Sequence, residues 1–343
     1  MCLVVCCGSL QLDAKGLDHA RAWFWSLQGL HLMLYTITGG AGFIGSHLAD
    51  LLLRGGHQVR VIDDLSTGKR DNLDTRVELI TADIRDSVAL SAAMLGAAGC
   101  FHLAAIASVE RTTQDWLGTH GVNQTGSIAV LDMARKLGGI PVVYASSAAI
   151  YGDIGDAVAH EALTPAPLTA YGADKLGSEL HARVGWGLHG VANVGLRFFN
   201  VYGPRQDPAS PYSGVISIFA RLAQSGRDLM VHGDGGQTRD FVYVGDVVTH
   251  LVAAMARIIA EPGCHVLNVC TGHNVTVSQL AQTILHASGQ NAGQGEGRII
   301  FGPARTGDIR TSLGDPSRAT AMLGVSADIS LADGLSRLME RPV

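Results

Sequence analysis

A glycine-rich turn near residue 40 limits the folds open to this chain more than any other feature. The stretch TGGAGFIGSHLADLLLRGG (38–56) follows an apolar β-rich run and leads into an amphipathic helical pattern. Gly40, Gly42 and Gly45 match the spacing GxGxxG, and Gly39 with the last two gives GxxGxxG. Glycines let the backbone approach a pyrophosphate, whose charge is stabilised by the free N–H groups of the following helix. The turn therefore predicts a strand–turn–helix unit that binds a dinucleotide.

Short β-rich runs alternate with helical patterns from Met33 onward. Apolar strands separated by helices are typical of a parallel sheet that is covered on both faces. We therefore expect an α/β fold with a doubly wound parallel sheet of the Rossmann type. The strand candidates are LYTIT (34–38), QVRVI (58–62), VELI (77–80), CFHLA (100–104), PVVYAS (141–146), VANVGLR (191–197) and HVLNV (265–269).

The alternation of strands and helices fails between residues 200 and 240. Three prolines crowd together there, and a helical stretch over 215–226 leads to the glycine turn GDGG at 233–236. Such a cluster of chain-breaking residues predicts that a second, smaller C-terminal lobe begins in this region.

Composition excludes several classes of function. The formal net charge is -5 with no block of like charge, which argues against a nucleic-acid or membrane-surface binder. The six cysteines contain no CxxC pair and no zinc-finger spacing, so we expect no metal site, no disulfide framework and a cytoplasmic protein. Charges scattered through residues 1–32 leave no apolar run long enough to span a bilayer. The lack of a basic start and of a cleavage-like site argues against a secretory signal. For residues 1–32, translation from Met33 and a peripheral helix from Ala20 to Leu30 stay open as alternatives.

Two acidic residues follow predicted strands on the cofactor side. Asp63 ends QVRVID, close to the expected separation of about 20 residues from the glycine turn. A carboxylate there accepts hydrogen bonds from ribose hydroxyls and repels a 2′-phosphate, so we expect NAD rather than NADP. A turn cap is the competing interpretation for Asp63. Asp83, which follows VELI, is a candidate contact for the adenine side of the cofactor. For Asp83, too, a turn cap is a competing interpretation of nearly equal weight.

Three side chains predict proton transfer. Tyr171 and Lys175 are four residues apart in the helical pattern 168–184 and so share a face. A neighbouring ammonium stabilises a phenolate, which makes Tyr171 a candidate proton acceptor with a lowered pKa. Ser147 ends a strand, where ligands bind in open α/β sheets, and is the third candidate catalytic residue. By contrast, we expect Tyr151 to be a packed residue and His102 to be a core or turn histidine.

The chain from about Leu34 to its C-terminus resembles the extended short-chain dehydrogenase/reductase family. Within that family the resemblance is to nucleotide-sugar epimerases of the UDP-glucose/UDP-N-acetylglucosamine 4-epimerase type. The stretches that carry it are TGGAGFIGSHL, DDLSTGK, HLAA, SSAAIYG, YGADK, LRFFNVYGPRQ, GDGGQTRDFVYVGDVV and RTGDIRTS. The resemblance implies that Tyr171 deprotonates the sugar 4-hydroxyl, that Ser147 orients it, and that a transient 4-keto sugar forms while NAD is regenerated.

The resemblance also assigns further positions. It implies an extension over 1–32, an NAD-binding domain over 33–198 and 240–272, and a nucleotide-sugar-binding lobe over 199–239 and 273–343. Implied cofactor-binding residues are Gly39, Gly42, Phe43, Ile44, Gly45, Asp63, Asp83, Ile84, Leu103, Ala104, Ala105, Asn123, Tyr171, Lys175 and Phe198. Implied substrate-binding residues are Ser147, Asn200, Arg239, Arg305, Asp308 and Ser312. Guanidinium forks suit phosphate oxygens, although surface ion pairs are the competing interpretation for both arginines.

Two alanines narrow the reaction type that the resemblance implies, and one serine narrows its substrate. Related dehydratases carry an Asp-Glu pair where this chain has Ala148 and Ala149, and related decarboxylases carry Glu, so both reactions are disfavoured. Many epimerases have Thr at the second of these positions, which puts one sugar contact in doubt. By resemblance, Ser312 occupies a steric gate that is bulky in members limited to plain hexoses. We therefore expect room for a 2-acetamido group.

Alternatives remain open at this point. Another enzyme that oxidises sugar C4, such as a reductase or a uronate or deoxysugar epimerase, would keep the same motifs. A non-enzymatic NAD-binding sensor is the alternative from another class, although such proteins commonly lose the Tyr/Lys pair. The resemblance also implies a homodimer formed through helices that begin near Asn123 and Ala173.

Overall fold

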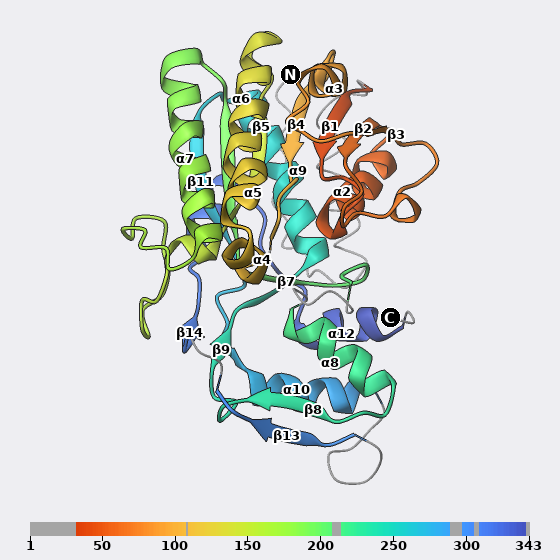
Figure 1. The fold of residues 1–343 in the computed structure, drawn as a ribbon, viewed down its shortest axis with the longest axis vertical. Helices are drawn as coiled ribbons and strands as arrows, with labels where there is room; N and C mark the ends of the chain where they lie inside the picture. The colour runs from red at the N-terminus through yellow and green to blue at the C-terminus, as the bar shows by residue number, and fades with distance from the viewer. Residues whose placement is uncertain (1–31, 108, 208–213, 289–296, 305–308, 341–343) are drawn as a thin grey trace, which may run out of the picture.

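A seven-stranded parallel sheet forms the upper half of the molecule in Figure 1. The structure is a computed structural model that describes residues 32–107, 109–207, 214–288, 297–304 and 309–340. The alternatives for residues 1–31 therefore lie outside the described residues. The strand order is β11-β6-β5-β4-β1-β2-β3, and all six pairings are parallel. The strands are β1 (Leu34–Thr38), β2 (Gln58–Asp63), β3 (Glu78–Thr81), β4 (Gly99–His102), β5 (Val142–Ser147), β6 (Asn193–Phe198) and β11 (Cys264–Val269).

Helices cover both faces of this sheet, which confirms the predicted doubly wound fold (Figure 1). One face packs against α2 (Phe43–Arg54) and α9 (Val244–Ala260), whose apolar side chains share a core with those of β1 and β6. The other face packs against α3 (Ser87–Met94), α6 (Gly126–Lys136) and α7 (Ala170–His189). Strands β1, β5 and β6 are buried on both faces, which explains their largely apolar pattern, whereas the edge strand β3 has no buried residue.

Short strands and helices build the lower half of the molecule in Figure 1. Its helices are α8 (Val215–Gln224), α10 (Val277–Ala287) and α12 (Leu331–Met339). The capping box of Thr276 and Gln279 fixes the start of α10. The domain boundaries expected from the sequence stay a prediction. The short strands are β7 (Asn200–Tyr202), β8 (Leu229–His232), β9 (Thr238–Arg239), β10 (Phe241–Tyr243), β12 (Val275–Thr276), β13 (Ile299–Gly302) and β14 (Thr311–Ser312).

Several short elements escaped the sequence patterns. The segment after β4 forms α4 (Val109–Gln114), α5 (Trp116–His120) and a π-helical turn (Gly121–Thr125) before α6. Helix α11 (Ser317–Leu323) packs against α9 and β11. Three-residue 3-10 turns cover Arg70–Asn72 and Ala148–Ile150. Elements this short carry too few residues to display a period.

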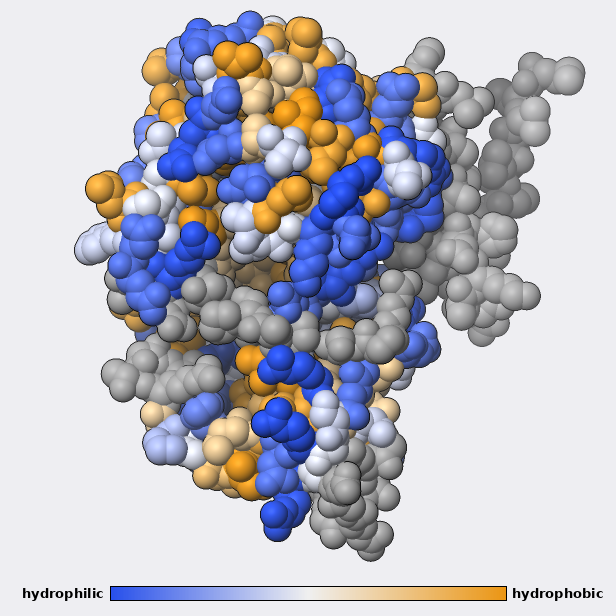
Figure 2. Space-filling model, turned by 45° about the vertical axis from the view of Figure 1, so that its right-hand side comes forward, coloured by the Kyte–Doolittle hydropathy of each residue, from blue (hydrophilic) through white to orange (hydrophobic). Residues whose placement is uncertain are grey.

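In the described part of the chain, no helix combines the length and apolar character needed to cross a bilayer. On the face shown in Figure 2, hydrophilic and hydrophobic side chains are interspersed.

Candidate active site

A large cleft lies at the carboxyl ends of the parallel strands. It has a volume of about 1430 Å³ and is lined by the segments that follow β1, β2, β3, β4, β5 and β6. The strand order reverses between β1 and β4, and open α/β sheets bind ligands at such a reversal. The cleft therefore occupies the place where a dinucleotide is expected.

The glycine turn between β1 and α2 forms one wall of this cleft. Gly39 has a φ of +69°, and a Cβ there would lie 2.6 Å from the backbone N of Ala104. A Cβ on Gly45 would lie 2.3 Å from the carbonyl oxygen of Gly39. Helix α2 begins after Gly42 with no acidic residue in its first turn, so its N–H groups are not neutralised by a neighbouring carboxylate. This backbone cradle fits a pyrophosphate.

Asp63 ends β2 and lines the cleft beside the glycine turn. Its Oδ2 accepts from the N–H of Ala41 at 2.9 Å, and its Oδ1 accepts from the N–H of Leu65 at 2.9 Å. Burial raises the pKa of this carboxyl, while the two backbone hydrogen bonds oppose that rise. Asp63 therefore both caps the turn and lines the cleft. Its carboxylate has further lone pairs that can accept hydrogen bonds from ribose hydroxyls. With the glycine cradle, these features fit NAD.

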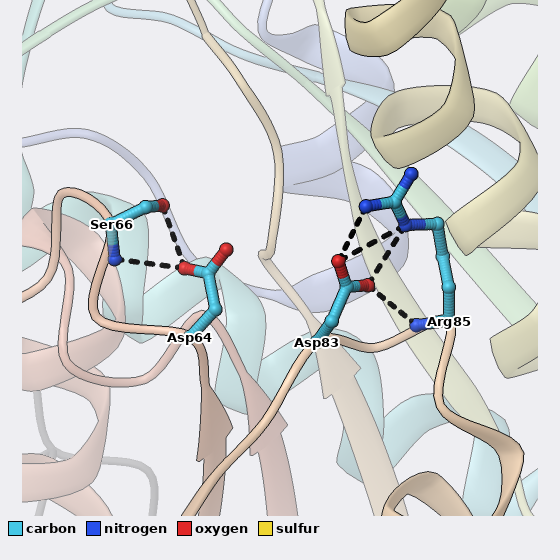
Figure 3. A network of polar contacts seen from close by, with 4 residues as sticks. All are labelled: Asp64, Ser66, Asp83 and Arg85. Atoms are coloured by element: carbon cyan, nitrogen blue, oxygen red, sulfur yellow. Dashed lines mark hydrogen bonds and ion pairs between the residues drawn. The ribbon is translucent and has the colours of Figure 1, made fainter.

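Asp83 follows β3 and Asp64 follows the neighbouring strand β2, and both are drawn with their polar contacts in Figure 3. Its Oδ1 accepts from the backbone N–H of Arg85 at 2.8 Å, and the Arg85 guanidinium contacts both carboxylate oxygens. These hydrogen bonds with Arg85 hold the pKa of Asp83 below its usual range. Asp64 makes the matching turn with Ser66, accepting from its N–H and hydroxyl at 2.9 and 2.6 Å. Both carboxylates therefore serve local turns while lining the cleft.

The segment after β4, residues 103–107, forms another wall of the cleft, and Asn123 holds it through hydrogen bonds to Ile106. The side-chain oxygen of Asn123 accepts from the N–H of Ile106 at 2.7 Å, and its amide nitrogen donates to the Ile106 carbonyl at 3.2 Å. Asn123 is fully buried and does not itself line the cleft. Leu103, Ala104 and Ala105 do line it, with Ala104 donating to Thr38 Oγ1 at 3.2 Å.

His102 continues this buried network behind the wall. Its Nδ1 lies 2.7 Å from Thr38 Oγ1, and its Nε2 lies 2.9 Å from Ser127 Oγ. Because Ser127 Oγ donates to the carbonyl of Asn123, the Nε2 of His102 must carry the proton and Nδ1 must accept. Burial, with a smaller contribution from the charge of Lys175, lowers the pKa of His102 to about 3. The prediction of a core histidine is confirmed.

Ser147, Tyr171 and Lys175 meet at the inner end of the cleft. Ser147 ends β5 and lies close enough to Tyr171 for its hydroxyl to oppose the rise in the pKa of the phenol. The Nζ of Lys175 lies 5.7 Å from the centroid of the Tyr171 ring and donates to the carbonyl of Ala145 at 2.9 Å. Thr169 caps the start of α7 and so fixes the turn that presents the phenol. The structure therefore brings together three residues that are spread over 28 positions of the sequence, from Ser147 to Lys175.

The expected lowering of the Tyr171 pKa is wrong. Burial raises its pKa to about 12, and the hydrogen bond with Ser147 only partly opposes that rise. The ammonium of Lys175 does not produce the expected downward shift, because its hydrogen bond directs it toward Ala145 rather than the phenolic oxygen. Burial also lowers the pKa of Lys175 to about 8, with the charge of Asp174 opposing that fall.

The remaining predicted residues divide into three groups. Phe198 and Asn200 line the cleft, as do Phe43, Ile44 and Ile84, whereas Arg239 and Ser312 are not part of its described lining. Arg239 and Ser312 are paired in register on the neighbouring strands β9 and β14. The guanidinium of Arg239 donates to the carbonyl of Thr238 at 2.8 Å. Arg305 and Asp308 lie outside the described residues.

A buried ion pair next to the catalytic candidates was missed. Arg197 on β6 and Glu179 on α7 pair at 2.7 Å, and Ser146 donates to the same carboxylate at 2.5 Å. Arg197 also donates to the hydroxyl of Tyr151, which is buried as expected and donates to Asn268 at 2.7 Å. The available signal was Arg197, the one charged residue of the strand NVGLRF, because a buried charge requires a partner.

Comparison with known proteins identifies relatives over most of the chain. The model of the NAD dependent epimerase/dehydratase family matches residues 35–270. UDP-glucose 4-epimerase from Mycolicibacterium smegmatis is 35% identical over 311 residues, which are 89% of this chain and 96% of that protein. The structure of UDP-glucose 4-epimerase from Thermotoga maritima with UDP-glucose has a TM-score of 0.84 and 34% identity, covering 90% and 98% of the two chains. UDP-N-acetylglucosamine 4-epimerase from Methanobrevibacter ruminantium, solved with UDP-N-acetylmuramic acid, has a TM-score of 0.84 and 30% identity, covering 91% and 98%.

Proposed function

The chain belongs to the NAD dependent epimerase/dehydratase family, and we propose that it is a UDP-sugar 4-epimerase that works through a transient 4-keto sugar. The observation that carries the proposal is the meeting of Ser147, Tyr171 and Lys175 at the inner end of the cleft. Relatives named as UDP-glucose 4-epimerases support the reaction type.

Each of the three side chains has a separate task in this proposal. Bound NAD supplies a positive charge and a hydride acceptor that also returns the hydride, so the reaction leaves no net oxidation. Tyr171 takes the proton of the sugar 4-hydroxyl as general base and later returns it. Ser147 hydrogen-bonds the same sugar oxygen, and Lys175 stabilises the phenolate through its charge. For this step the positive charges of Lys175 and of bound NAD must offset the burial that raises the pKa of Tyr171.

The 3-10 turn after Ser147 supports epimerisation over dehydration. Ala148 and Ala149 occupy this turn, and the N–H of Ala149 donates to Ser147 Oγ at 3.1 Å. Expulsion of the sugar C6 hydroxyl needs an acid and a base beside the ketone. Methyl side chains at both positions provide neither, so the sugar keeps its C6 hydroxyl.

We further propose that the substrate pair includes UDP-GlcNAc and UDP-GalNAc. The small side chain of Ser312 lies on β14 next to Arg239 on β9. Both residues stand where the resemblance to nucleotide-sugar epimerases implies substrate contacts. A related structure is that of a UDP-N-acetylglucosamine 4-epimerase. A serine hydroxymethyl leaves space that an aromatic ring at the same position would fill.

A homodimer through α6 and α7 is part of the proposal. Leu180 and Val184 on α7 are each 49% exposed, and Leu188 is 75% exposed, one turn apart along the helix. Apolar side chains spaced four residues apart on one helix face match a helix–helix contact. Light scattering of the purified protein measures the assembly, and a monomer at micromolar concentration would refute this part.

Incubation with a panel of UDP-sugars, without added reductant, tests the function. We expect each substrate to reach an equilibrium mixture of its two C4 epimers with no net loss of NAD. Tyr171→Phe is expected to abolish conversion while NAD binding stays close to that of the parent protein. Stoichiometric consumption of NAD would instead indicate a dehydrogenase or reductase, and unchanged turnover of the Phe variant would remove the mechanism.

A further inference from the structure

Asp174 is a buried carboxylate directly beside the candidate catalytic lysine. It lies on α7, one residue before Lys175, and its side chain is 4% exposed. Its Oδ1 accepts a hydrogen bond from Nδ1 of His120 at 2.6 Å. Within the described part of the chain, no donor lies within hydrogen-bond distance of its Oδ2. A carboxylate held this way has lost most of its hydration and gained one partner, which is a costly arrangement.

The charge of Asp174 acts on Lys175. Burial favours the neutral amine of Lys175, and the negative charge of Asp174 favours the ammonium. His102 on β4 is held neutral by its low pKa, and Tyr171 is a neutral phenol, so neither supplies a compensating negative charge. Among the described residues, the elements packed against α7 also carry Arg111 on α4 and Asp115 before α5, and Glu179 of α7 itself is paired with Arg197.

His120 fixes Asp174 from a second element. It is the last residue of α5, which packs against α7 beside the cleft (Figure 1). Asp115 caps the start of the same short helix, and Asp115 and Gly118 line the cleft. The hydrogen bond between His120 and Asp174 therefore ties a wall of the cleft to the helix that carries Tyr171 and Lys175.

We propose that Asp174 is a positioning residue for Lys175, whose buried carboxylate, fixed by His120, keeps the lysine side chain protonated at the inner end of the cleft. Packing alone does not require a charge at this point, since a serine or alanine would fit between α5 and α7 without losing hydration. The inference rests on the proposed role of Lys175, but the ionisation of the lysine is measured without substrate.

Competitive labelling with acetic anhydride measures that ionisation, because only the neutral amine reacts. The acetylated fraction of Lys175 is followed by peptide mass spectrometry against pH, on the full chain without NAD or substrate. The labelling midpoint of the parent protein is expected near the pKa of about 8. Asp174→Asn and Asp174→Ser are each expected to lower the midpoint by about one pH unit, the effect of removing one nearby opposite charge.

Matched variants separate charge from packing. His120→Asn keeps an N–H donor at the position of Nδ1 and is expected to leave the midpoint unchanged. His120→Ala removes the donor, so the midpoint is expected to move in the same direction as in the Asp174 variants. Asp132→Asn removes an exposed carboxylate from α6 and is expected to have no effect.

An unchanged midpoint in folded Asp174→Asn and Asp174→Ser would overturn the proposal, even if both variants unfold at lower temperature. An unchanged midpoint in His120→Ala would remove the role of His120. Neither readout depends on epimerase activity. A protein that fails to convert UDP-sugars therefore still tests this inference, and a shifted midpoint does not rescue the proposed function.

Discussion

Arg197 and Glu179 form an ion pair in which both side chains are at most 6% exposed, with Arg197 Nη2 and Glu179 Oε2 2.7 Å apart. The pair joins β6 to α7 one turn beyond Lys175, and Ser146 next to Ser147 donates to the same carboxylate. The pair therefore connects the strand and the helix that bring Ser147, Tyr171 and Lys175 together.

Breaking this pair is expected to destabilise the protein strongly. Arg197→Met leaves Glu179 buried without a compensating charge, which costs about 3–5 kcal/mol. The double variant Arg197→Met with Glu179→Leu removes both charges and is expected to recover much of that loss. Urea unfolding of the parent, single and double variants measures the difference. A double variant no more stable than the single one would contradict this account.

Because of His102, the free energy of unfolding is expected to fall as the pH is lowered. In the unfolded chain its imidazole binds a proton near pH 6.5, whereas in the folded protein the pKa is lowered to about 3. The unfolded state therefore binds more protons between these values. The contribution of His102 is complete above pH 6.5 and is lost as the pH falls toward 3, by about 1.4 kcal/mol per pH unit.

Comparison with His102→Asn isolates this effect. The asparagine side chain does not titrate, so the free energy of unfolding of the variant is expected to fall less steeply between pH 6.5 and 4. Chemical denaturation at several pH values gives both slopes. Equal slopes would mean that His102 is protonated in the folded protein.

Replacement by alanine is expected to lower the stability of the protein at Gly45 on α2 and to raise it at Gly187 on α7. In Gly45→Ala the new Cβ would collide with the backbone of Gly39 and Gly40, so NAD affinity and stability should both fall, the latter by about 1–3 kcal/mol. Gly187 is exposed on α7 with no atom within 4 Å of its added Cβ. Gly187→Ala is expected to stabilise the protein by up to about 1 kcal/mol through helix propensity. Thermal unfolding and NAD titration test both, and normal NAD binding by Gly45→Ala would contradict the cradle.

Ser312 is expected to govern substrate size. Ser312→Tyr fills the space next to Arg239 and should reduce turnover of the UDP-GlcNAc/UDP-GalNAc pair at least about tenfold relative to the UDP-glucose/UDP-galactose pair. Ser312→Ala keeps the space and serves as the matched control. Measurement of kcat/KM for both pairs decides, and an equal loss on both pairs would reject the gate.

Local sequence determined the framework of this protein. The glycine spacing, the β-branched runs and the i,i+4 relation of Tyr171 and Lys175 each depend on residues close together in the chain. Backbone sterics and helix geometry act over such distances, so the sheet, the cofactor cleft and the shared face of the two side chains could be predicted.

Tertiary structure decided the electrostatics of the site. Burial, which depends on elements far apart in sequence, raises the pKa of Tyr171 although a lysine lies four residues away. The pairs Arg197–Glu179 and His120–Asp174 join residues 18 and 54 positions apart, and no local pattern connects their members. A charge responds to everything packed around it, and that packing exists only once the chain has folded.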